Sequence, residues 1–582
     1  MSEFALFMRW TLKKPLISLL YCFRKINYKI KKIIFKNNNP YKNQLFIKND
    51  NELEKITYQK IKISKIIHLA GSKMKITGNI NWHKKFKDSE DEERLHRFSW
   101  AIDIASQQKT NKRELHWIEN EILRWYDSFY IEIIENKTKS FKWEAYTVSE
   151  RIANIYLFYQ LINKKIPNSL KQRINNEAIF LINNLEFFYK SINNHIINNS
   201  RALYFASQIC NNKKFEKISI NIFKNTISKL ITKDGFLREG SSHYQFIFHR
   251  WVFEIFYFSQ LHKNNYSKYL SKISNRLFNG TSFFTTKTSN VSFPLFGDIS
   301  PDFTPKWIMD FPTVYHSKKI NRTKYNSWIN LFETINKNHK SKFFQPYKSF
   351  SQTNIKSSEW FKFKKFDHEI MFRLNDAEPK TFPGHFHNDL GHFIYLYKKK
   401  EIFIDTGRYN YYDSKDFYGE NHNSITINKL GITPKEKWLP IKYSQSFNNI
   451  RCFETQNKLK ITLNMTGFSR IKKSLKWTRS ITFLKKKLIL LDTINGKLDN
   501  SYVDSFFYTS KQCKKNKKQI HIYSDNLKGY MKSNIKKQDI NKYRASIHQY
   551  GELKLINQIH YNNFLNSEKN FNKNIFTLDW NQ

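Results

Sequence analysis

The sequence predicts a protein that is helical first and rich in β-strands afterwards, with at least two domains. Three observations predict this fold class. The chain has 582 residues, which is more than one hydrophobic core usually organises. From about residue 89 to 340 apolar residues recur at helical spacing, and beyond about residue 355 short strand-like segments are bounded by Lys, Asn and Gly turns. Hydrophobic residues make up 40% of the chain and aromatic residues 16%, so we expect globular cores.

The first element in the chain is a basic extension, which we expect to cover residues 1–75. Lys13 and Lys14 stand before a short apolar stretch, which is weakly similar to a signal peptide. Arg24 and Lys25 follow soon after, no small-residue cleavage site is evident, and no apolar run is long enough to span a bilayer. A basic amphipathic extension explains the same residues. We therefore expect a protein of the cell envelope or periplasm with peripheral envelope association, and the cytoplasm stays open as the alternative.

The next region, residues 76–345, is predicted to be an all-α domain. Its connections are short and rich in Asn, Lys and Ser, which is typical of successive antiparallel helices. The spacing permits a bundle or a toroid of helical hairpins. Its aromatic stripes are interpreted as core packing rather than as platforms for sugars. The periodic positions are Leu115, Ile118, Ile122, Leu123, Trp125, Ile152, Ile155, Tyr156, Phe158, Tyr159, Trp251, Phe253, Ile255, Phe256 and Phe258.

A change in composition between residues 343 and 358, where Ser, Gln and Asn are frequent, marks the expected domain boundary. A second domain is predicted over residues 355–582. Its short strands suggest an antiparallel β-sandwich. The predicted strands are 368–374, 393–397, 401–405, 450–453, 459–464, 479–484, 487–491, 503–508 and 520–523.

The charge of the chain limits which classes of partner it can bind, and the spacing of its cysteines indicates the state of its thiols. The chain has 99 Lys and Arg residues against 49 Asp and Glu residues, a net charge of +50. Such a surface attracts nucleic acid, anionic membrane or acidic polysaccharide, although codon bias in an AT-rich genome also explains an excess of lysine. No nucleic-acid-binding motif is present, so we expect no specific nucleic-acid partner. The four cysteines, Cys22, Cys210, Cys452 and Cys513, form no Cys-x-x-Cys pair, so we expect reduced thiols.

One polar cluster lies at the start of the predicted β domain, in Gly384-His385-Phe386-His387-Asn388-Asp389. In an extended segment His385 and His387 point to the same side, because side chains alternate with period two. With Asp405 and His422, His387 completes a plausible His/Asp/His zinc site. The alternative is that these histidines only form hydrogen bonds with the loop backbone.

A second polar cluster lies in the helical region. Ser241 or Ser242 is a suitable N-cap for a helix whose first turn contains Tyr244. Backbone N–H groups and the helix dipole favour an anion there, so Tyr244 is a candidate for proton exchange. Asn194 and His195 also interrupt a helical pattern, and both can hydrogen-bond a carboxylate. An ordinary capped core helix explains either segment taken alone. Two clusters on two kinds of scaffold indicate a site at a domain interface.

Taken together, these segments resemble the heparinase II/III family of polysaccharide lyases. The resemblance covers most of the chain, from about Trp82 to the middle of the C-terminal domain. All of the matching segments together, in this order, are specific to the family, whereas any single segment would be weak evidence for it. The matching segments are Asn81-Trp82-His83, Asn194-His195 through Leu203, Asp234-Gly235 through Tyr244, Phe296-Gly297-Asp298, Gly384 through Asp389, Asp405 through Tyr409, and His422-Asn423.

The resemblance implies an (α/α) toroid, an antiparallel β-sandwich, and cleavage of a uronate-containing anionic polysaccharide by β-elimination without an organic cofactor. Asn194 and His195 would neutralise the uronate carboxylate. Tyr244 would be the shared acid and base, with His385 as base or second proton-transfer group and Tyr409 in support. A non-catalytic or modifying envelope protein that binds polysaccharide on the same fold is the alternative.

The resemblance also implies one structural zinc ion. His387, Asp405 and His422 match the positions that hold the ion in some members of the family, where the metal organises the loop under His385. The chain departs from the family at Gln245, where a histidine is common.

Overall fold

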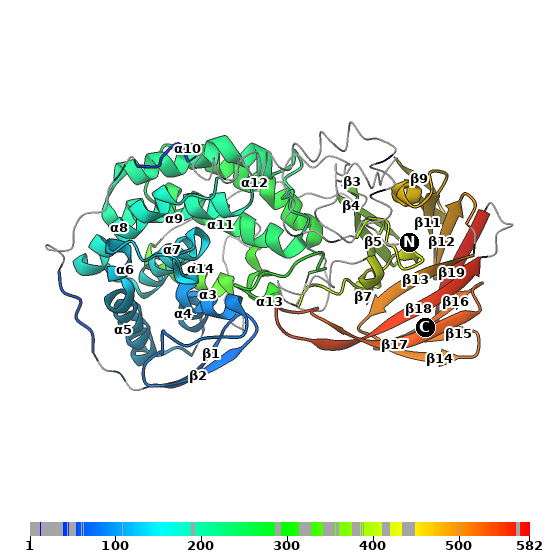
Figure 1. The fold of residues 1–582 in the computed structure, drawn as a ribbon, viewed down its shortest axis with the longest axis horizontal. Coiled ribbons are helices and arrows are strands. Elements are labelled where there is room, and N and C mark those ends of the chain that lie inside the picture. Colours follow the sequence, from blue (N-terminus) through cyan, green and yellow to red (C-terminus); the bar gives the residue numbers. More distant parts are fainter. Residues whose placement is uncertain are drawn as a thin grey trace.

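The computed structural model shows a helical domain joined to a domain of antiparallel sheets (Figure 1). The structure describes residues 39–43, 54–59, 63–107, 109–187, 192–285, 293–312, 327–340, 360–374, 389–409, 419–433, 449–498, 500–565 and 571–581, and the separate residues or pairs 8, 12, 45, 61, 355–356, 385 and 387.

The helical domain begins with a small hairpin and continues as helices that pack on one another. The hairpin pairs β1 (Ser64–His68) with β2 (Lys73–Thr77), and its Ile67 and Met74 belong to the same core as the helices. The helices are α3 (Ser89–Arg97), α4 (Ser99–Ala105), α5 (Lys112–Phe129), α6 (Ile131–Ile134), α7 (Ala145–Ile162), α8 (Asn168–Asn183), α9 (His195–Cys210), α10 (Lys213–Leu230), α11 (Ser242–Leu261), α12 (Ser267–Phe284), α13 (Pro305–Ile308) and α14 (Trp328–Asn338).

Asparagine explains several of the tight connections in this domain. Asn111 caps α5, where its side chain accepts from the Glu114 N–H group and the Glu114 carboxylate accepts from the Asn111 N–H group. Asn163 and Asn211 end α7 and α9 in the left-handed conformation, at φ 53° and 51°. Asparagine adopts this conformation more readily than other residues with a side chain. The Asn-rich composition therefore supplies short turns between antiparallel helices.

The C-terminal domain consists of three antiparallel sheets. An eight-stranded sheet has the order β14-β15-β16-β19-β12-β11-β10-β9, a four-stranded sheet β17-β18-β13-β8, and a five-stranded sheet β3-β4-β5-β6-β7. The strands are β3 (Ile355–Lys356), β4 (Trp360–Lys365), β5 (His368–Arg373), β6 (Phe393–Tyr397), β7 (Lys400–Phe403), β8 (Ile425–Ile427), β9 (Asn449–Thr455), β10 (Lys458–Met465), β11 (Lys476–Leu484), β12 (Lys487–Asn495), β13 (Ser501–Thr509), β14 (Gln512–Asn516), β15 (Gln519–Ser524), β16 (Leu527–Ser533), β17 (Lys537–Ala545), β18 (Lys554–Leu565) and β19 (Phe571–Asn581).

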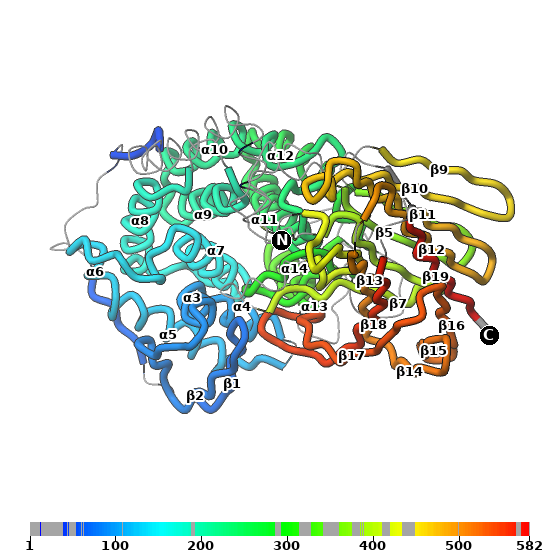
Figure 2. The backbone as a smooth tube through the Cα atoms, turned by 45° about the vertical axis from the view of Figure 1, so that its right-hand side comes forward, coloured from blue at the N-terminus to red at the C-terminus, as the bar shows by residue number. Residues whose placement is uncertain are grey.

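The eight-stranded and four-stranded sheets enclose a common core. Ile461, Ile481 and Leu490 of the larger sheet pack in one buried cluster with Phe507 and Ile559 of the smaller sheet. Residues between them on each strand point the other way, because side chains alternate along a strand. Figures 1 and 2 show the eight-stranded sheet at the end of the molecule farthest from the helices.

The predicted fold class is confirmed: a helical toroid is followed by an antiparallel β-sandwich. The helices run from Ser89 to Asn338, close to the predicted 89–340, and each predicted strand overlaps an observed one. The composition change at 343–358 lies largely outside the described residues, and so does Cys22. Cys210 and Cys513 are free thiols, as expected. Within the described ranges, no helix is both long and apolar enough to cross a membrane.

Candidate active site at the domain junction

The start of α9 places Asn194 and His195 at the junction. Asn194 is fully buried, and its N–H group donates to Glu239 Oε1 at 2.6 Å. Neither Oδ1 nor Nδ2 of its amide has a hydrogen-bond partner among the described residues. His195 Nδ1 donates to Glu186 Oε1 at 2.8 Å, and its ring lies 4.6 Å from that of Tyr146. A buried amide without a partner is unusual, so this end of α9 is suited to receive a polar ligand.

The start of α11 places Tyr244 beside α9. Ser241, one of the two predicted candidates, is the N-cap, and its hydroxyl accepts from the Tyr244 N–H group at 3.2 Å. The same hydroxyl donates to the Asp298 carbonyl at 2.7 Å. Tyr244 is 5% exposed, and its ring stacks on that of His385 with 3.5 Å between centroids and 10° between planes. The tyrosine of the helical domain therefore meets a histidine of the C-terminal domain directly.

His385 is held between two segments of the helical domain. Its N–H group donates to the Glu239 carbonyl at 3.2 Å, and its carbonyl accepts from the Asp298 N–H group at 3.1 Å. Its Nδ1 donates to Asp298 Oδ2 at 3.0 Å, while Nε2 faces Glu239 Oε2 at 3.3 Å. The ring thus lies between two buried carboxylates. The hydrogen bond to Asp298 fixes its orientation against Tyr244.

Asp298 is the carboxylate that joins the two domains. Its Oδ2 accepts from His385 and from Arg408 Nη1 at 2.9 Å, and its Oδ1 accepts from His387 Nε2 at 2.9 Å. Burial alone would raise the pKa of Asp298, but these two histidine hydrogen bonds and the Arg408 charge outweigh it and hold the pKa well below its usual range. Asp298 is therefore ionised, and it organises His385, His387 and Arg408.

The turn that carries Asp298 requires glycine. Gly297 has φ +68°, and a Cβ atom there would lie 2.5 Å from the His385 carbonyl oxygen. Its N–H group donates to Asp405 Oδ2 at 3.0 Å. A close approach of this kind, in the left-handed region, is available only to glycine.

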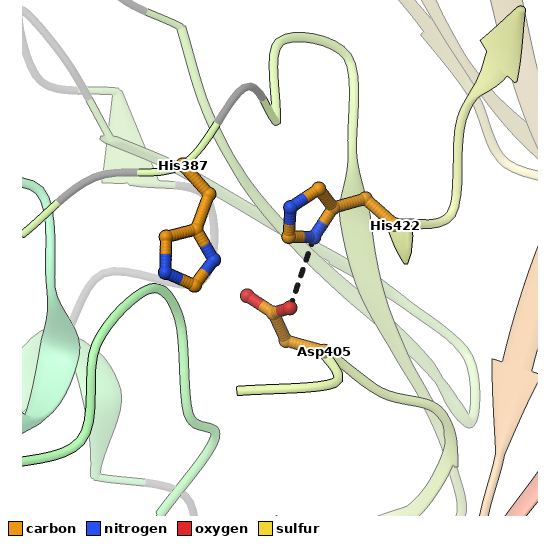
Figure 3. A group of neighbouring side chains, drawn as sticks. All are labelled: His387, Asp405 and His422. Atoms are coloured by element: carbon orange, nitrogen blue, oxygen red, sulfur yellow. Dashed lines mark hydrogen bonds and ion pairs between the residues drawn. The ribbon is translucent and has the colours of Figure 1, made fainter. Parts of the chain in front are cut away.

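His387, Asp405 and His422 form a buried group next to this site (Figure 3). The three side chains point toward one another, and one nitrogen or oxygen atom from each lies within 4.8 Å of the other two. His422 Nδ1 donates to Asp405 Oδ1 at 3.0 Å. Although burial would raise the pKa of Asp405, the charges of His422 and His392 outweigh it and lower the pKa well below its usual range. An ionised carboxylate between two imidazoles fits a divalent metal such as zinc.

Most of the predicted site residues come together. Asn194, Glu239, His385 and Tyr244 form a connected chain of contacts, and His195 follows Asn194 and interacts electrostatically with Glu239. The pKa of His195 is raised, because the Glu186 carboxylate outweighs the effect of burial. Tyr409 has a 36% exposed side chain, and its carbonyl accepts from Gly551. Its supporting role stays a prediction.

Sequence reasoning missed several residues of the site. Asp298 and Arg408 both lie in segments that resemble the family, but no local pattern indicated that they pair with each other. Glu239 lies in the segment from Asp234 to Tyr244, which leads into α11, but no role was predicted for it. Glu186 lies in the irregular segment after α8, which has no recognisable motif, so nothing in the sequence indicated its contact with His195.

The molecule thus combines a helical toroid with a β-sandwich, and polar side chains of both domains meet at their junction. Residues 349–537 match the family model described as Heparinase II/III-like, C-terminal, which confirms the resemblance seen in the sequence. A search of curated protein sequences gives no match.

Solved structures of polysaccharide lyases share the fold. A crystal structure of heparinase III is 16% identical with a TM-score of 0.62, covering 86% of this chain and 79% of that one. The heparan sulfate lyase HepC from Pedobacter heparinus, determined as a mutant, is 14% identical with a TM-score of 0.54, covering 89% and 81%. The chondroitin AC lyase of Streptomyces coelicolor A3, solved with chondroitin sulphate, is 8% identical with a TM-score of 0.51, covering 84% and 74%. At these identities the likeness concerns the fold.

Proposed function

We propose that the protein is a polysaccharide lyase that cleaves a uronate-containing anionic polysaccharide by β-elimination. The observation that carries the proposal is the stacking of Tyr244 on His385 at 3.5 Å, with the buried Asn194 linked to His385 through Glu239. One proton-exchanging pair and one carboxylate-binding group are what this reaction needs.

Different residues of the site would carry out different steps of the reaction. The proton on C5 is a poor acid, and its removal builds negative charge on the neighbouring carboxylate. The Asn194 amide and the positively charged form of His195 stabilise that charge, and Glu186 favours this form of His195. Tyr244 or His385 takes the proton, the C4–O4 bond breaks as the C4–C5 double bond forms, and a proton from this pair goes to the leaving oxygen.

The substrate class is an acidic polysaccharide, as in the structural neighbours described as heparan sulfate lyase and solved with chondroitin sulphate. The net charge of +50 favours an anionic chain. We expect the protein to act in the cell envelope or periplasm, where such chains occur, and its basic N-terminal extension motivates that location.

The decisive experiment measures the ultraviolet absorbance of unsaturated uronate products. Purified protein is mixed with heparan sulfate, hyaluronan, chondroitin sulfate, alginate and bacterial capsule polysaccharides. Absorbance should rise with at least one of them, and Tyr244→Phe should abolish the rise while polysaccharide binding persists. Tyr257→Phe is the matched control, because Tyr257 lies on the same helix and donates to Asn336 away from the site. Binding without turnover by the unmodified protein would favour a binding protein on the same fold.

We also propose that His387, Asp405 and His422 hold one structural zinc ion. When bound, the ion would supply positive charge that holds Asp405 and the two imidazoles together, next to the residues that orient His385. The chain's own residues carry out every proton transfer.

Chelation tests the metal proposal. Elemental analysis should find one zinc ion per chain, and removing it should lower the melting temperature, because loss of a ligand present at 1,000 times its Kd costs about 4 kcal/mol. His422→Ala should abolish zinc binding. His368→Ala removes a buried histidine of the same domain outside the group, so it should keep the zinc. Equal metal content in both variants would contradict the assignment.

A further inference from the structure

The eight-stranded sheet has a solvent-facing side that we call the outer face. It consists of the residues that alternate with the buried core positions on β9 to β12, β14 to β16 and β19. On β10, for example, Leu459 and Ile461 are buried in the sandwich, whereas Lys458 and Lys460 are exposed. The strands lie side by side without a break, so the outer face is one continuous surface.

Basic residues are spread over the whole outer face. At its β9 end stand Arg451, Lys458, Lys460 and Lys476, which cross-strand pairing places on the same side. Among the described strand residues the face has one carboxylate, Asp579, and Lys487 pairs with it at 2.9 Å.

The other end of the face adds cations and aromatic rings. Lys514, Lys528 and Lys532 lie on β14 and β16, and Lys573 and Lys487 lie between the two ends. The described outer face therefore has nine basic side chains against one acidic side chain.

The aromatic rings of the outer face lie among these lysines. Lys528 Nζ lies 5.5 Å from the Tyr523 ring centroid and 5.2 Å from that of Tyr530. His521 packs against Tyr530 at 4.9 Å. Partial burial and the charges of Lys528 and Lys514 lower the pKa of His521, which reflects a positive environment. Cations beside half-exposed tyrosines suit a ligand that is both anionic and rich in C–H and hydroxyl groups.

The composition of the chain as a whole does not explain this charge. The outward side of the four-stranded sheet belongs to the same domain and is balanced: its strand positions include Lys537 and Lys554 but also Asp504 and Asp539. His560 and Asn562 donate to Asp504 there. The excess of positive charge is thus concentrated on one of the two sides of the sandwich.

The outer face is separate from the candidate active site. Its strands lie at the far end of the molecule from the helices in both views (Figures 1 and 2), and the sandwich core lies behind it. Its width, seven spacings between eight strands, is about 33 Å, far more than one small anion needs. Among the residues of this face whose burial the structure describes, the exposed large apolar ones are Phe453 and Ile575, which are too few for an apolar surface that inserts into lipid.

We propose that the outer face is a second, non-catalytic binding surface for an anionic polysaccharide. The identity of the occupant rests on the proposed function, because it is the same class of polymer that the site at the domain junction is proposed to cleave. Binding there holds the protein on a polyanionic matrix and raises the local concentration of polysaccharide near the candidate active site.

The test compares two sets of four substitutions, both in the Tyr244→Phe background so that the ligand stays intact. The outer-face variant is Lys460→Gln, Lys476→Gln, Lys528→Gln and Lys532→Gln. The control removes the same charge from exposed positions of α10, with Lys213→Gln, Lys214→Gln, Lys217→Gln and Lys229→Gln. Equilibrium binding to immobilised heparan sulfate and alginate is measured over a range of NaCl concentrations.

The outer-face variant should bind at least about tenfold more weakly and with a shallower dependence on salt, because four ion-pairing groups are lost. The α10 control should stay within about twofold of its parent, as expected for charges remote from the ligand. Equal weakening in both variants would show that only net charge matters and would overturn the proposal. So would unchanged binding in the outer-face variant, or face-dependent binding to phosphatidylglycerol vesicles without binding to the polysaccharides.

Turnover separates this inference from the proposed function. With Tyr244 restored, the outer-face substitutions should leave kcat/KM on short oligosaccharides unchanged and raise KM on the polymer. If no uronan is cleaved by any form, the lyase proposal fails, while the binding comparison still decides the role of the outer face. Loss of turnover on short oligosaccharides would contradict a separate surface.

Discussion

Asn194 illustrates how single residues at the junction differ from ordinary core residues. It is fully buried, and its amide Oδ1 and Nδ2 find no partner among the described residues. Leaving a buried polar group unsatisfied costs about 1–3 kcal/mol. Asn199, five residues further on in the same helix, donates to Ser149 Oγ at 2.9 Å and accepts from the Glu186 N–H group. Asn199 therefore stabilises the packing of the helices, whereas the Asn194 amide is suited to bind a ligand.

Asn194→Ala should therefore affect catalysis far more than stability. Removing a donor that stabilises developing negative charge costs about 10²–10³ in kcat. The melting temperature should change little, since no side-chain hydrogen bond is lost. Asn199→Ala is the matched comparison, and it should destabilise the protein by about 1–3 kcal/mol. Absorbance assays and thermal melts measure both effects, and a large drop in stability for Asn194→Ala would contradict its assigned role.

His243 predicts how stability depends on pH. Burial lowers the pKa of His243 to about 3, with Arg250 adding to the effect, and its Nδ1 accepts from the Ser300 N–H group. The unfolded chain binds a proton near pH 6.5 and the folded protein does not, so stability falls as pH drops below 6.5. The loss from this residue should reach about 1–2 kcal/mol at pH 5.5. Urea unfolding at pH 7.5 and 5.5 measures it, and His243→Gln should show a correspondingly smaller difference.

At the scale of elements, the start of α11 links helix formation to the active site. The Ser241 hydroxyl caps the helix through the Tyr244 N–H group and also donates to the Asp298 carbonyl. The cap therefore fixes two parts of the site at once: the helix that carries Tyr244 and the turn that carries Asp298.

Ser241→Ala should lower both stability and turnover. Loss of a serine N-cap costs about 0.5–2 kcal/mol. Asn212→Ala removes the equivalent cap of α10, where Asn212 accepts from the Lys214 N–H group away from the site. Both variants should unfold at lower urea concentration, but only Ser241→Ala should lower kcat. Equal kcat in the two variants would mean that the cap acts on the fold alone.

The sequence predicted elements better where the pattern was local. The Ser241 cap and the β10 alternation could be read directly, because a cap or a strand face depends on neighbouring residues. The predicted set did not include β17 or β18, where Lys, Asn and Gln interrupt the apolar periodicity, and it also lacked β3, β4, β8, β14, β16 and β19. The contacts of Asp298 with His385 and Arg408 bridge 87 and 110 positions in the chain, and only the fold brings such pairs together.

At the scale of the whole molecule, the residues of the candidate site also form contacts between the two domains. Asp298 of the helical domain binds His385, His387 and Arg408 of the C-terminal domain, and Gly297 donates to Asp405. Tyr550 donates to Asp88 at 3.0 Å elsewhere on the interface. The position of the Tyr244 ring against His385 therefore depends on how the domains are held together.

Asp298→Ala should consequently separate the unfolding of the two domains. The change removes the buried carboxylate that pairs with Arg408, His385 and His387, and breaking a buried pair in this way costs about 3–5 kcal/mol. Because these contacts cross the interface, calorimetry should show two transitions where the unmodified protein shows a more cooperative one, and turnover should be lost. Asp492→Ala breaks a buried pair with Arg479 inside the C-terminal domain, so it should lower that domain's stability without uncoupling the two. If Asp298→Ala melted as one unit, the domains would be joined mainly by their apolar contacts, and the junction carboxylate would be needed only for orienting His385.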